Sequence, residues 1–309
     1  MTYIHHLNGG VLQAAGGLRG VCHCLLLEDP AGLTLVDTGI GLEDVRDPLG
    51  RVGRAAIDAA GFQFDAGHTL LRQLQRLGLT AGDVEHIVLT HADPDHVGGL
   101  ADFPHAVVHV AAEELAALTR GDERYRPKQF AHVVRWRAYG PTQASWFGLA
   151  ARPVAVPGPG RVLLVELFGH TAGHCGVAVE KSGGRWLLHA GDAYYLRDEL
   201  TNDRHPVAAL AAARAVNDDL RRASLAHVQR LTHDFADEIE IMNYHDAAEL
   251  PPGGLMAKND VSQAGADGTA GPATSGQSNA VQSNAGRSNA GGTAAGNEPA
   301  GRTPAGRIP

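Results

Sequence analysis

The sequence lacks the features that nucleic-acid-binding and membrane proteins need. It has no long run of Lys and Arg, and 26 basic residues against 34 acidic ones give a net charge of −8. Proteins that bind nucleic acid by neutralising phosphates normally carry the opposite balance or a basic patch. The most apolar runs, such as residues 162–168, are far too short to cross a bilayer. We therefore expect neither a nucleic-acid partner nor a membrane partner.

Cysteine is also scarce. Cys22, Cys24 and Cys175 are an odd number at spacings that do not suggest a disulfide framework, which favours a reducing compartment. The amino end, residues 1–10, lacks a basic stretch that leads into an apolar one, the usual signature of export. These features predict a cytoplasmic location.

The last part of the chain lacks the means to form a core. Residues 258–309 contain no aromatic residue and only Val261, Val281 and Ile308 as sizeable aliphatics. Such a composition buries too little apolar surface to offset the entropy of ordering the chain. We predict one folded domain over residues 1–257 and a disordered, low-complexity tail over residues 258–309.

The body of the chain alternates short aliphatic runs with helical patterns. The runs predict strands at residues 21–27, 33–36, 87–89, 106–110, 162–168, 177–179 and 186–188. Helical periodicity predicts helices at residues 68–77 and 113–118 and one long helix from about 207 to 231. This order of elements favours a layered α/β body with helices outside the sheets.

Residues 121–148 fit neither pattern. The segment carries several aromatics and Arg124, Arg126, Arg135 and Arg137. It predicts either a flap that covers a substrate or an ordinary surface excursion. The four arginines could attract an acidic substrate, but a solvated face is the preferred interpretation.

Histidine is abundant, with 17 residues, and it is concentrated where chemistry is expected. An apolar strand ends at Thr90 and is followed by His91, Asp93, Asp95 and His96. A strand-to-helix loop can turn these side chains toward one point. So many imidazoles and carboxylates together predict a metal site, because packing them in one place without a cation would be electrostatically unfavourable.

This segment resembles the His-x-His-x-Asp-His signature of the metallo-β-lactamase superfamily, with Asp93 in place of the second His. Further motifs of that family follow in order and supply His170, Asp192 and His245, and residues 35–39 match an early element in which Asp37 is structural. The resemblance implies an αββα sandwich with two face-to-face β-sheets and a metal site at one edge.

The resemblance also implies the ligands of a binuclear centre with two divalent metal ions. The first ion would be held by His91, Asp93 and His170, and the second by Asp95, His96 and His245. Asp192 would bridge the two ions. A water between them would lose a proton and attack the substrate as hydroxide.

Asp93 is the departure from the family pattern. Its extra negative charge predicts a shift of the first site from zinc toward manganese or iron. If Asp93 instead turns away, His91, His170 and Asp192 remain as a set that suits mononuclear iron(II). That set resembles the persulfide dioxygenases of the same superfamily.

The family resemblance implies a metal-dependent hydrolase of a small carbonyl substrate, namely a lactone, ester or thioester. Asp95 would manage the proton, and Tyr195 would donate a hydrogen bond to the developing oxyanion. Tyr195 stands where N-acyl-homoserine lactonases of the superfamily have a substrate-facing tyrosine, with Tyr194 a weaker candidate. The alternatives are an oxygen-consuming iron enzyme and a scaffold that binds metal without turnover.

Overall fold

The structure, a computed structural model, describes residues 3–14, 17–133, 135–158, 160–202 and 204–252. Within them, the strands form two sheets, one with the order β4-β1-β2-β3-β5-β6-β7 and one with the order β13-β12-β11-β10-β9-β8. The strands of the first sheet are β1 (Tyr3–Gln13), β2 (Arg19–Asp29), β3 (Gly32–Val36), β4 (Phe62–Gln63), β5 (Val84–Val88), β6 (Val107–Ala111) and β7 (Trp136–Tyr139). Those of the second are β8 (Ser145–Trp146), β9 (Leu149–Val154), β10 (Val162–Glu166), β11 (Cys175–Glu180), β12 (Trp186–His189) and β13 (Ile239–Met242).

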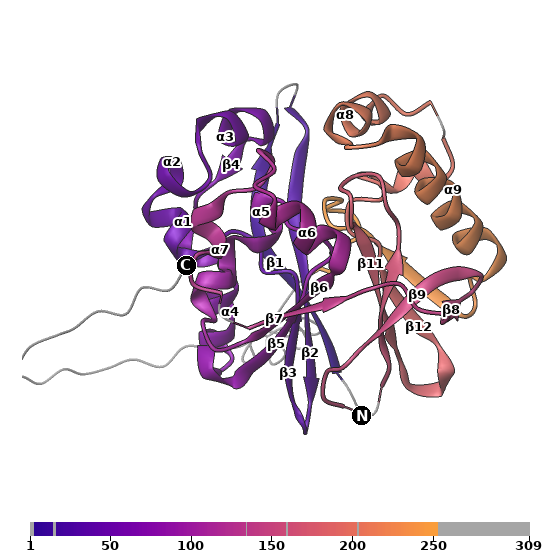
Figure 1. The fold of residues 1–309 in the computed structure, drawn as a ribbon, viewed down its shortest axis with the longest axis horizontal. Helices are drawn as coiled ribbons and strands as arrows, with labels where there is room; N and C mark the ends of the chain where they lie inside the picture. Colours follow the sequence, from indigo (N-terminus) through magenta and orange to yellow (C-terminus); the bar gives the residue numbers. More distant parts are fainter. Residues whose placement is uncertain (1–2, 15–16, 134, 159, 203, 253–309) are drawn as a thin grey trace, which may run out of the picture. The chain divides into compact units, whose positions relative to one another are not determined.

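Helices cover the outer face of each sheet (Figure 1). The α-helices are α1 (Leu42–Arg46), α2 (Pro48–Arg51), α3 (Arg54–Ala60), α4 (Leu70–Arg76), α5 (Pro94–Val97), α6 (Ala112–Thr119), α7 (Pro127–Phe130), α8 (Val207–Arg214) and α9 (Asp218–Asp234). Short 3-10 helices are η2 (Ala66–His68), η3 (Ala81–Asp83), η4 (Gly98–Asp102), η5 (Ser182–Gly184) and η6 (Arg197–Leu200). In Figure 1, α1 to α4 and α7 flank the first sheet, and α8 and α9 flank the second. This arrangement confirms the expected αββα sandwich.

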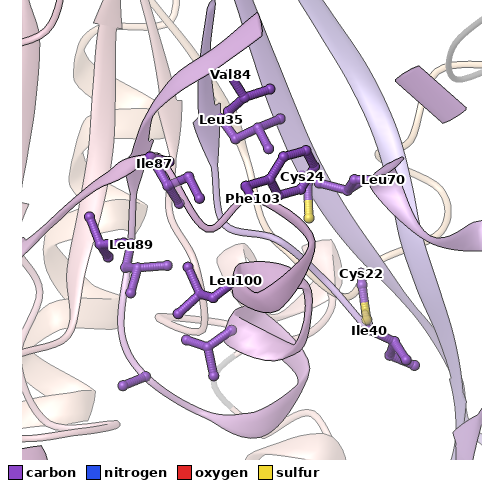
Figure 2. Close-up of a cluster of buried hydrophobic side chains, with 14 of the residues drawn as sticks. Cys22, Cys24, Leu35, Ile40, Leu70, Val84, Ile87, Leu89, Leu100 and Phe103 are labelled. Carbon is purple, nitrogen blue, oxygen red and sulfur yellow. The ribbon is translucent and has the colours of Figure 1, made fainter. Parts of the chain in front are cut away.

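Side-chain alternation along the strands divides the core into layers. On β2, Cys22 and Cys24 face the helices on the outer side of the first sheet, together with Leu26. Figure 2 shows both cysteines among the buried side chains of this layer, near Ile40 and Leu70. They are free and fully buried, as expected for small strand residues rather than metal ligands.

The alternate residues of β2 fill the space between the two sheets. Leu25 and Leu27 belong to a buried cluster that also contains Leu164 of β10 and Val177 of β11. The outer layer of the second sheet is completed by α9, whose buried side chains, among them Val228, pack on that sheet.

Each expected strand overlaps an observed one, but β1, β4, β7, β8, β9 and β13 were not foreseen. β1 is 11 residues long and pairs with β2, although Asn8, Gly9 and Gly10 interrupt its apolar pattern. The register of this pair shifts between Asn8 and Val11, and a Cβ on Gly9 would lie 3.0 Å from the Gly39 backbone. The glycine that obscures the strand pattern therefore allows the segments around Gly9 and Gly39 to approach closely. β13 pairs with β12 in parallel.

The single helix expected over residues 207–231 is wrong. The chain breaks between α8 and α9 at residues 215–217, where Asn217 caps α9 by accepting a hydrogen bond from the Leu220 N–H. At the break, the Val216 N–H donates to the His170 carbonyl over 3.0 Å and the Asn217 N–H donates to the Gly169 carbonyl over 2.9 Å. The break therefore supports the loop that carries His170.

Residues 121–148 connect the sheets through α7, β7 and β8, and most of their described side chains are exposed or half-buried. No helix among the described residues is long and apolar enough to cross a membrane. The tail predicted over residues 258–309 lies outside the described residues.

Candidate metal centre

The chain changes direction at the end of β5, and this turn delivers four candidate ligands. After the strand ends at Val88, His91 and Asp93 precede α5, and Asp95 and His96 lie within it. Pro94 occupies the first helical position, which its fixed backbone angle suits. All four side chains are buried.

The other candidate ligands come from the second half of the chain. His170 lies in the loop between β10 and β11, Asp192 follows β12, and His245 follows β13. Their ligand atoms form two groups whose members lie within 4.8 Å of one another, His91 with Asp93, His170 and Asp192, and Asp95 with His96 and His245. The seven residues named from the sequence are thus brought together in space.

Asp192 lies between the two groups. Its Oδ2 is 3.2 Å from His170 Nε2 in the first group and 3.3 Å from His245 Nε2 in the second. Its Oδ1 is 3.3 Å from His96 Nε2. This is the position that a bridging carboxylate requires.

Hydrogen bonds fix the orientation of the imidazoles in the second group. His96 Nδ1–H donates to Asp37 Oδ2 over 2.8 Å, and His245 Nδ1–H donates to the Val21 carbonyl over 3.0 Å. Each bond leaves Nε2 directed at the carboxylates, as outer hydrogen bonds do for metal-binding histidines. Asp37 also accepts bonds from the N–H and hydroxyl of Thr90.

Two residues place Asp192. His174 Nδ1–H donates to the Leu167 carbonyl over 2.7 Å, so its Nε2 accepts the Asp192 backbone N–H over 2.9 Å. Burial lowers the pKa of His174 to about 4, which keeps the ring neutral for this role. Gly191 adopts a φ of 56°, and a Cβ there would lie 2.6 Å from His174 Nε2. His174 thus acts through Asp192.

The charges of the cluster are mutually dependent. Burial disfavours the charged form of both His96 and Asp192. The carboxylates of Asp192, Asp37 and Asp95 nevertheless hold the pKa of His96 well above its ordinary value. The imidazoles of His245, His96 and His170 hold the pKa of Asp192 well below its own.

Several atoms of the cluster fit a bound cation. Among the described residues, His91 Nε2, His96 Nε2 and Asp192 Oδ1 are buried and have no hydrogen-bond partner. Unpaired buried polar atoms are costly and call for an explanation such as a bound ion. Imidazole and carboxylate together suit the divalent transition metals.

A pocket opens onto this cluster. Its polar end includes Asp93, Asp95, Asp192, Tyr195 and His245. Its walls are mostly apolar and are formed by Leu12, Ala14, Leu18, Ala59, Ala60, Leu196 and Leu210, with Arg19 and Arg214 nearby. A small molecule with an apolar group can therefore reach the candidate ligands.

The two neighbouring tyrosines point to different places. Tyr195 lines the pocket, and its ring centroid is 5.4 Å from that of His245 and 6.0 Å from that of His170. Tyr194 is fully buried, and its hydroxyl donates to Glu249 over 3.0 Å. Only Tyr195 is therefore placed to meet a substrate.

The family comparison agrees with this geometry. A model described as the metallo-beta-lactamase superfamily matches residues 17–234. The chain belongs to this superfamily. The matched residues include Asp93 and the other candidate ligands as far as Asp192, and they end before His245.

Curated relatives are found in bacteria. The probable metallo-hydrolase Rv2300c of Mycobacterium tuberculosis is 47% identical over 205 residues, which cover 64% of this chain and 64% of the relative. The N-acyl homoserine lactonase AttM of Rhizobium radiobacter is 28% identical over 178 residues, which cover 56% of this chain and 65% of the relative. The chain thus spans a little under two thirds of the length of these relatives.

A solved structure shares the fold. It is an N-acyl homoserine lactone hydrolase with the product N-hexanoyl-L-homoserine at its catalytic metal center. The likeness has a TM-score of 0.62 at 20% identity and covers 79% of this chain and 93% of the other. A likeness at this identity supports the superfamily fold.

Two residues at the candidate site were not foreseen. Tyr244 stacks on His96 with centroids 3.7 Å apart, and its hydroxyl donates to the Asp95 carbonyl over 2.7 Å. Glu114 of α6 accepts the Ala92 N–H. Tyr244 precedes a predicted ligand, which is a weak signal, whereas Glu114 reads in the sequence as an ordinary helix residue.

Arg124 also lies at the candidate site, and here the expectation of a solvated face is wrong. Its side chain is 17% exposed, and its Nε and Nη2 donate to the two oxygens of Asp93. Burial opposes the charge of Asp93, but the guanidinium of Arg124 and the nearby imidazoles of His170 and His91 hold the pKa of that carboxyl well below its ordinary value. Of the four arginines in residues 121–148, Arg124 is the one at the candidate metal centre.

Proposed function

We propose that this chain is a metal-dependent hydrolase of a small carbonyl compound with an apolar substituent, namely a lactone, ester or thioester. The observation that carries the proposal is the apolar-walled pocket that ends on Asp95, Asp192, Tyr195 and His245. Pockets with apolar walls and a few converging polar groups are typical binding sites.

The cofactor would be divalent metal held by the two groups around Asp192. Asp95, His96 and His245 form one group of candidate ligands, and His91, Asp93 and His170 form the other. Zinc suits this donor set, and the extra carboxylate of Asp93 widens the choice to manganese or iron. When bound, such an ion lowers the pKa of a coordinated water to about 7 and polarises a carbonyl oxygen.

The chain's own residues would bind, orient and exchange protons with the substrate. The walls around Leu12 and Leu196 would hold the apolar group and exclude water. Burial raises the pKa of Tyr195 well above its ordinary value, so the phenol keeps its proton and can donate a hydrogen bond to an oxyanion. Asp95, beside His245 and at the pocket, would take and return the proton.

The relatives support lactones as the first substrates to test. AttM is named as an N-acyl homoserine lactonase, and the solved structure holds an acyl-homoserine product. A lactone, an ester and a thioester that share one acyl chain should therefore be assayed with the metal-loaded protein. A rate no higher than that of His96→Ala for all three would favour a metal-binding scaffold. Oxygen uptake that depends on a sulfur substrate and one iron per chain would favour the dioxygenase.

Tyr195 gives a sharper test of the mechanism. Tyr195→Phe removes only the hydroxyl and should lower kcat by roughly 10²-fold, the usual loss when one oxyanion donor is removed. KM should change little, because the apolar contacts remain. The matched control is Tyr194→Phe, whose lost bond to Glu249 lies away from the pocket and should leave kcat unchanged. Equal kcat for Tyr195→Phe and the unaltered protein would remove Tyr195 from the mechanism.

A further inference from the structure

Arg124 reaches the first group of candidate ligands from the loop between α6 and α7. Its Nη2 donates to Asp93 Oδ2 over 2.6 Å and lies 2.8 Å from His170 Nε2, while Nη1 donates to the Arg214 carbonyl over 2.5 Å. A guanidinium has donors but no acceptor. The Arg124 N–H therefore meets the lone pair of His170 Nε2 that a metal ion would use.

The two groups differ in this respect. In the second group, His96 Nε2 has no hydrogen-bond partner among the described residues, and His245 Nε2 faces only the carboxylates of Asp95 and Asp192. In the first group, His91 Nε2 likewise has no hydrogen-bond partner among the described residues, but the other two proposed ligands besides the bridging Asp192, namely Asp93 and His170, already bind a permanent cation. Arg124 therefore uses ligand atoms that a metal ion in the first group would need, whereas the ligand atoms of the second group remain available to an ion.

The formal charges point the same way. The cluster contains three carboxylates, those of Asp93, Asp95 and Asp192. Arg124 and one divalent ion together carry three positive charges, which balance them. With Arg124 in place, a second divalent ion would leave an excess of positive charge in a buried site, even with a hydroxide between the two ions, and uncompensated buried charge is costly.

The Arg124 loop is fixed rather than free. The hydroxyl of Tyr125 donates to Glu114 over 2.8 Å, and Glu114 also accepts the Ala92 N–H beside the ligand loop. The Arg124 N–H donates to Asp122 over 3.0 Å. These bonds hold the start of the Arg124 side chain in place against the ligand loop.

The side chain of Asp93 is used in its ion pair with Arg124. It stands at the N-cap of α5, where an aspartate usually accepts a helical N–H, yet it makes no side-chain cap hydrogen bond. Both of its oxygens instead face Arg124. A two-pronged pair of this kind is strong and directional.

We propose that Arg124 takes the place of the first metal ion, so that the chain binds one divalent ion at Asp95, His96, His245 and Asp192. The guanidinium pairs with Asp93 and supplies positive charge where the superfamily signature would place a second ion. This inference rests on the proposed function, because it assumes that the second group binds metal.

The test is metal stoichiometry. The full chain is saturated with manganese or zinc, dialysed and measured by elemental analysis, with Arg124→Ala and the control Arg120→Ala treated alongside. Arg120 is exposed and lies four residues earlier, at the end of α6. We expect one ion per chain for the unaltered protein and Arg120→Ala, and two for Arg124→Ala, in which His170 Nε2 and Asp93 become available.

A second measurement keeps the proposal testable if Arg124→Ala does not fold. Electron paramagnetic resonance of the manganese-loaded, unaltered chain should show the six-line spectrum of isolated Mn(II). A spectrum of two exchange-coupled ions would overturn the proposal, as would two ions per unaltered chain.

The remaining outcomes separate this inference from the proposed function. One ion in both the unaltered chain and Arg124→Ala would show that Arg124 does not set the number of ions. No ion in any variant would instead overturn the metal-dependent function. One ion that is lost in His91→Ala but kept in His245→Ala would place it in the first group and overturn the assignment.

Discussion

Single residues in this protein are defined by their partners more than by their type. Asp93 occupies the N-cap position of α5, but its side chain pairs with Arg124 instead of capping the helix. Tyr194 and Tyr195 are neighbours of one chemical kind, and only Tyr195 lines the pocket. Residue type therefore fixes what a side chain can do, and its contacts fix what it does.

Asp102, at the end of η4, offers a prediction at this scale. Burial, together with the charges of Asp44 and Glu43, raises its pKa to about 6, even though it accepts the Leu42 N–H over 3.0 Å. The folded protein therefore binds this proton more tightly than the unfolded chain does. Stability from this group is present below pH 4 and is lost as the pH rises through 6.

Asp102→Asn removes the titration and keeps an acceptor for Leu42. Between pH 4 and pH 7, the free energy of unfolding of the variant should rise relative to that of the unaltered protein by up to about 3 kcal/mol. Urea unfolding of both proteins at the two pH values measures this difference. A constant offset at both values would contradict the prediction.

At the scale of elements, the breaks and turns position the site. β5 and α5 bring four candidate ligands to one turn, and the break between α8 and α9 supports the His170 loop. The helical periodicity of residues 207–231 is continuous enough to suggest one helix. Local helix propensity carries no information about hydrogen bonds to a loop that is distant in the sequence. The break is decided by backbone bonds to Gly169 and His170.

The start of α9 can be tested through its cap. Asn217→Ala loses the bond from the Leu220 N–H and should lower the free energy of unfolding by about 1 kcal/mol. Asn217→Ser should stay within a few tenths of a kcal/mol of the unaltered protein, because serine caps equally well. Urea unfolding of the three proteins provides the comparison, and equal losses for Ala and Ser would show that the cap bond is not the cause.

For the whole molecule, buried histidines between the sheets link folding to pH. His23 of β2 and His109 of β6 are fully buried. Burial lowers the pKa of His23 to about 2 and that of His109 to about 3. The unfolded chain takes up these protons near pH 6.5 while the folded protein does not. Stability is therefore present above pH 6.5 and is lost as the pH falls below it.

His109→Gln should remove one of the protons that the unfolded chain binds and the folded protein does not. Between pH 6.5 and pH 4.5, the unaltered protein should lose about 1.4 kcal/mol more per pH unit than the variant. Unfolding by urea at half-unit steps of pH measures the two slopes. Parallel slopes would mean that His109 takes up its proton in the folded state as well.

Much of the fold and of the candidate site could be predicted because the signals are local. The aliphatic runs gave the central strands, and the spacing of His91, Asp93, Asp95 and His96 identified the ligand loop. β1 was missed because Asn8 and its glycines disrupt the alternation. Arg124 was misjudged because its contact with Asp93 spans 31 residues, and nothing in its local sequence indicates burial.

The sequence by itself determined the superfamily, the order of the layers and the residue types that gather at the sheet edge, since these follow from periodicity and short motifs. Only the tertiary structure decided that the guanidinium of Arg124 pairs with the candidate ligand Asp93. Arg124 and Asp93 are brought together by the path of the loop after α6, which Tyr125 and Glu114 hold in place. Contacts between distant segments depend on that path, and composition and spacing do not specify it.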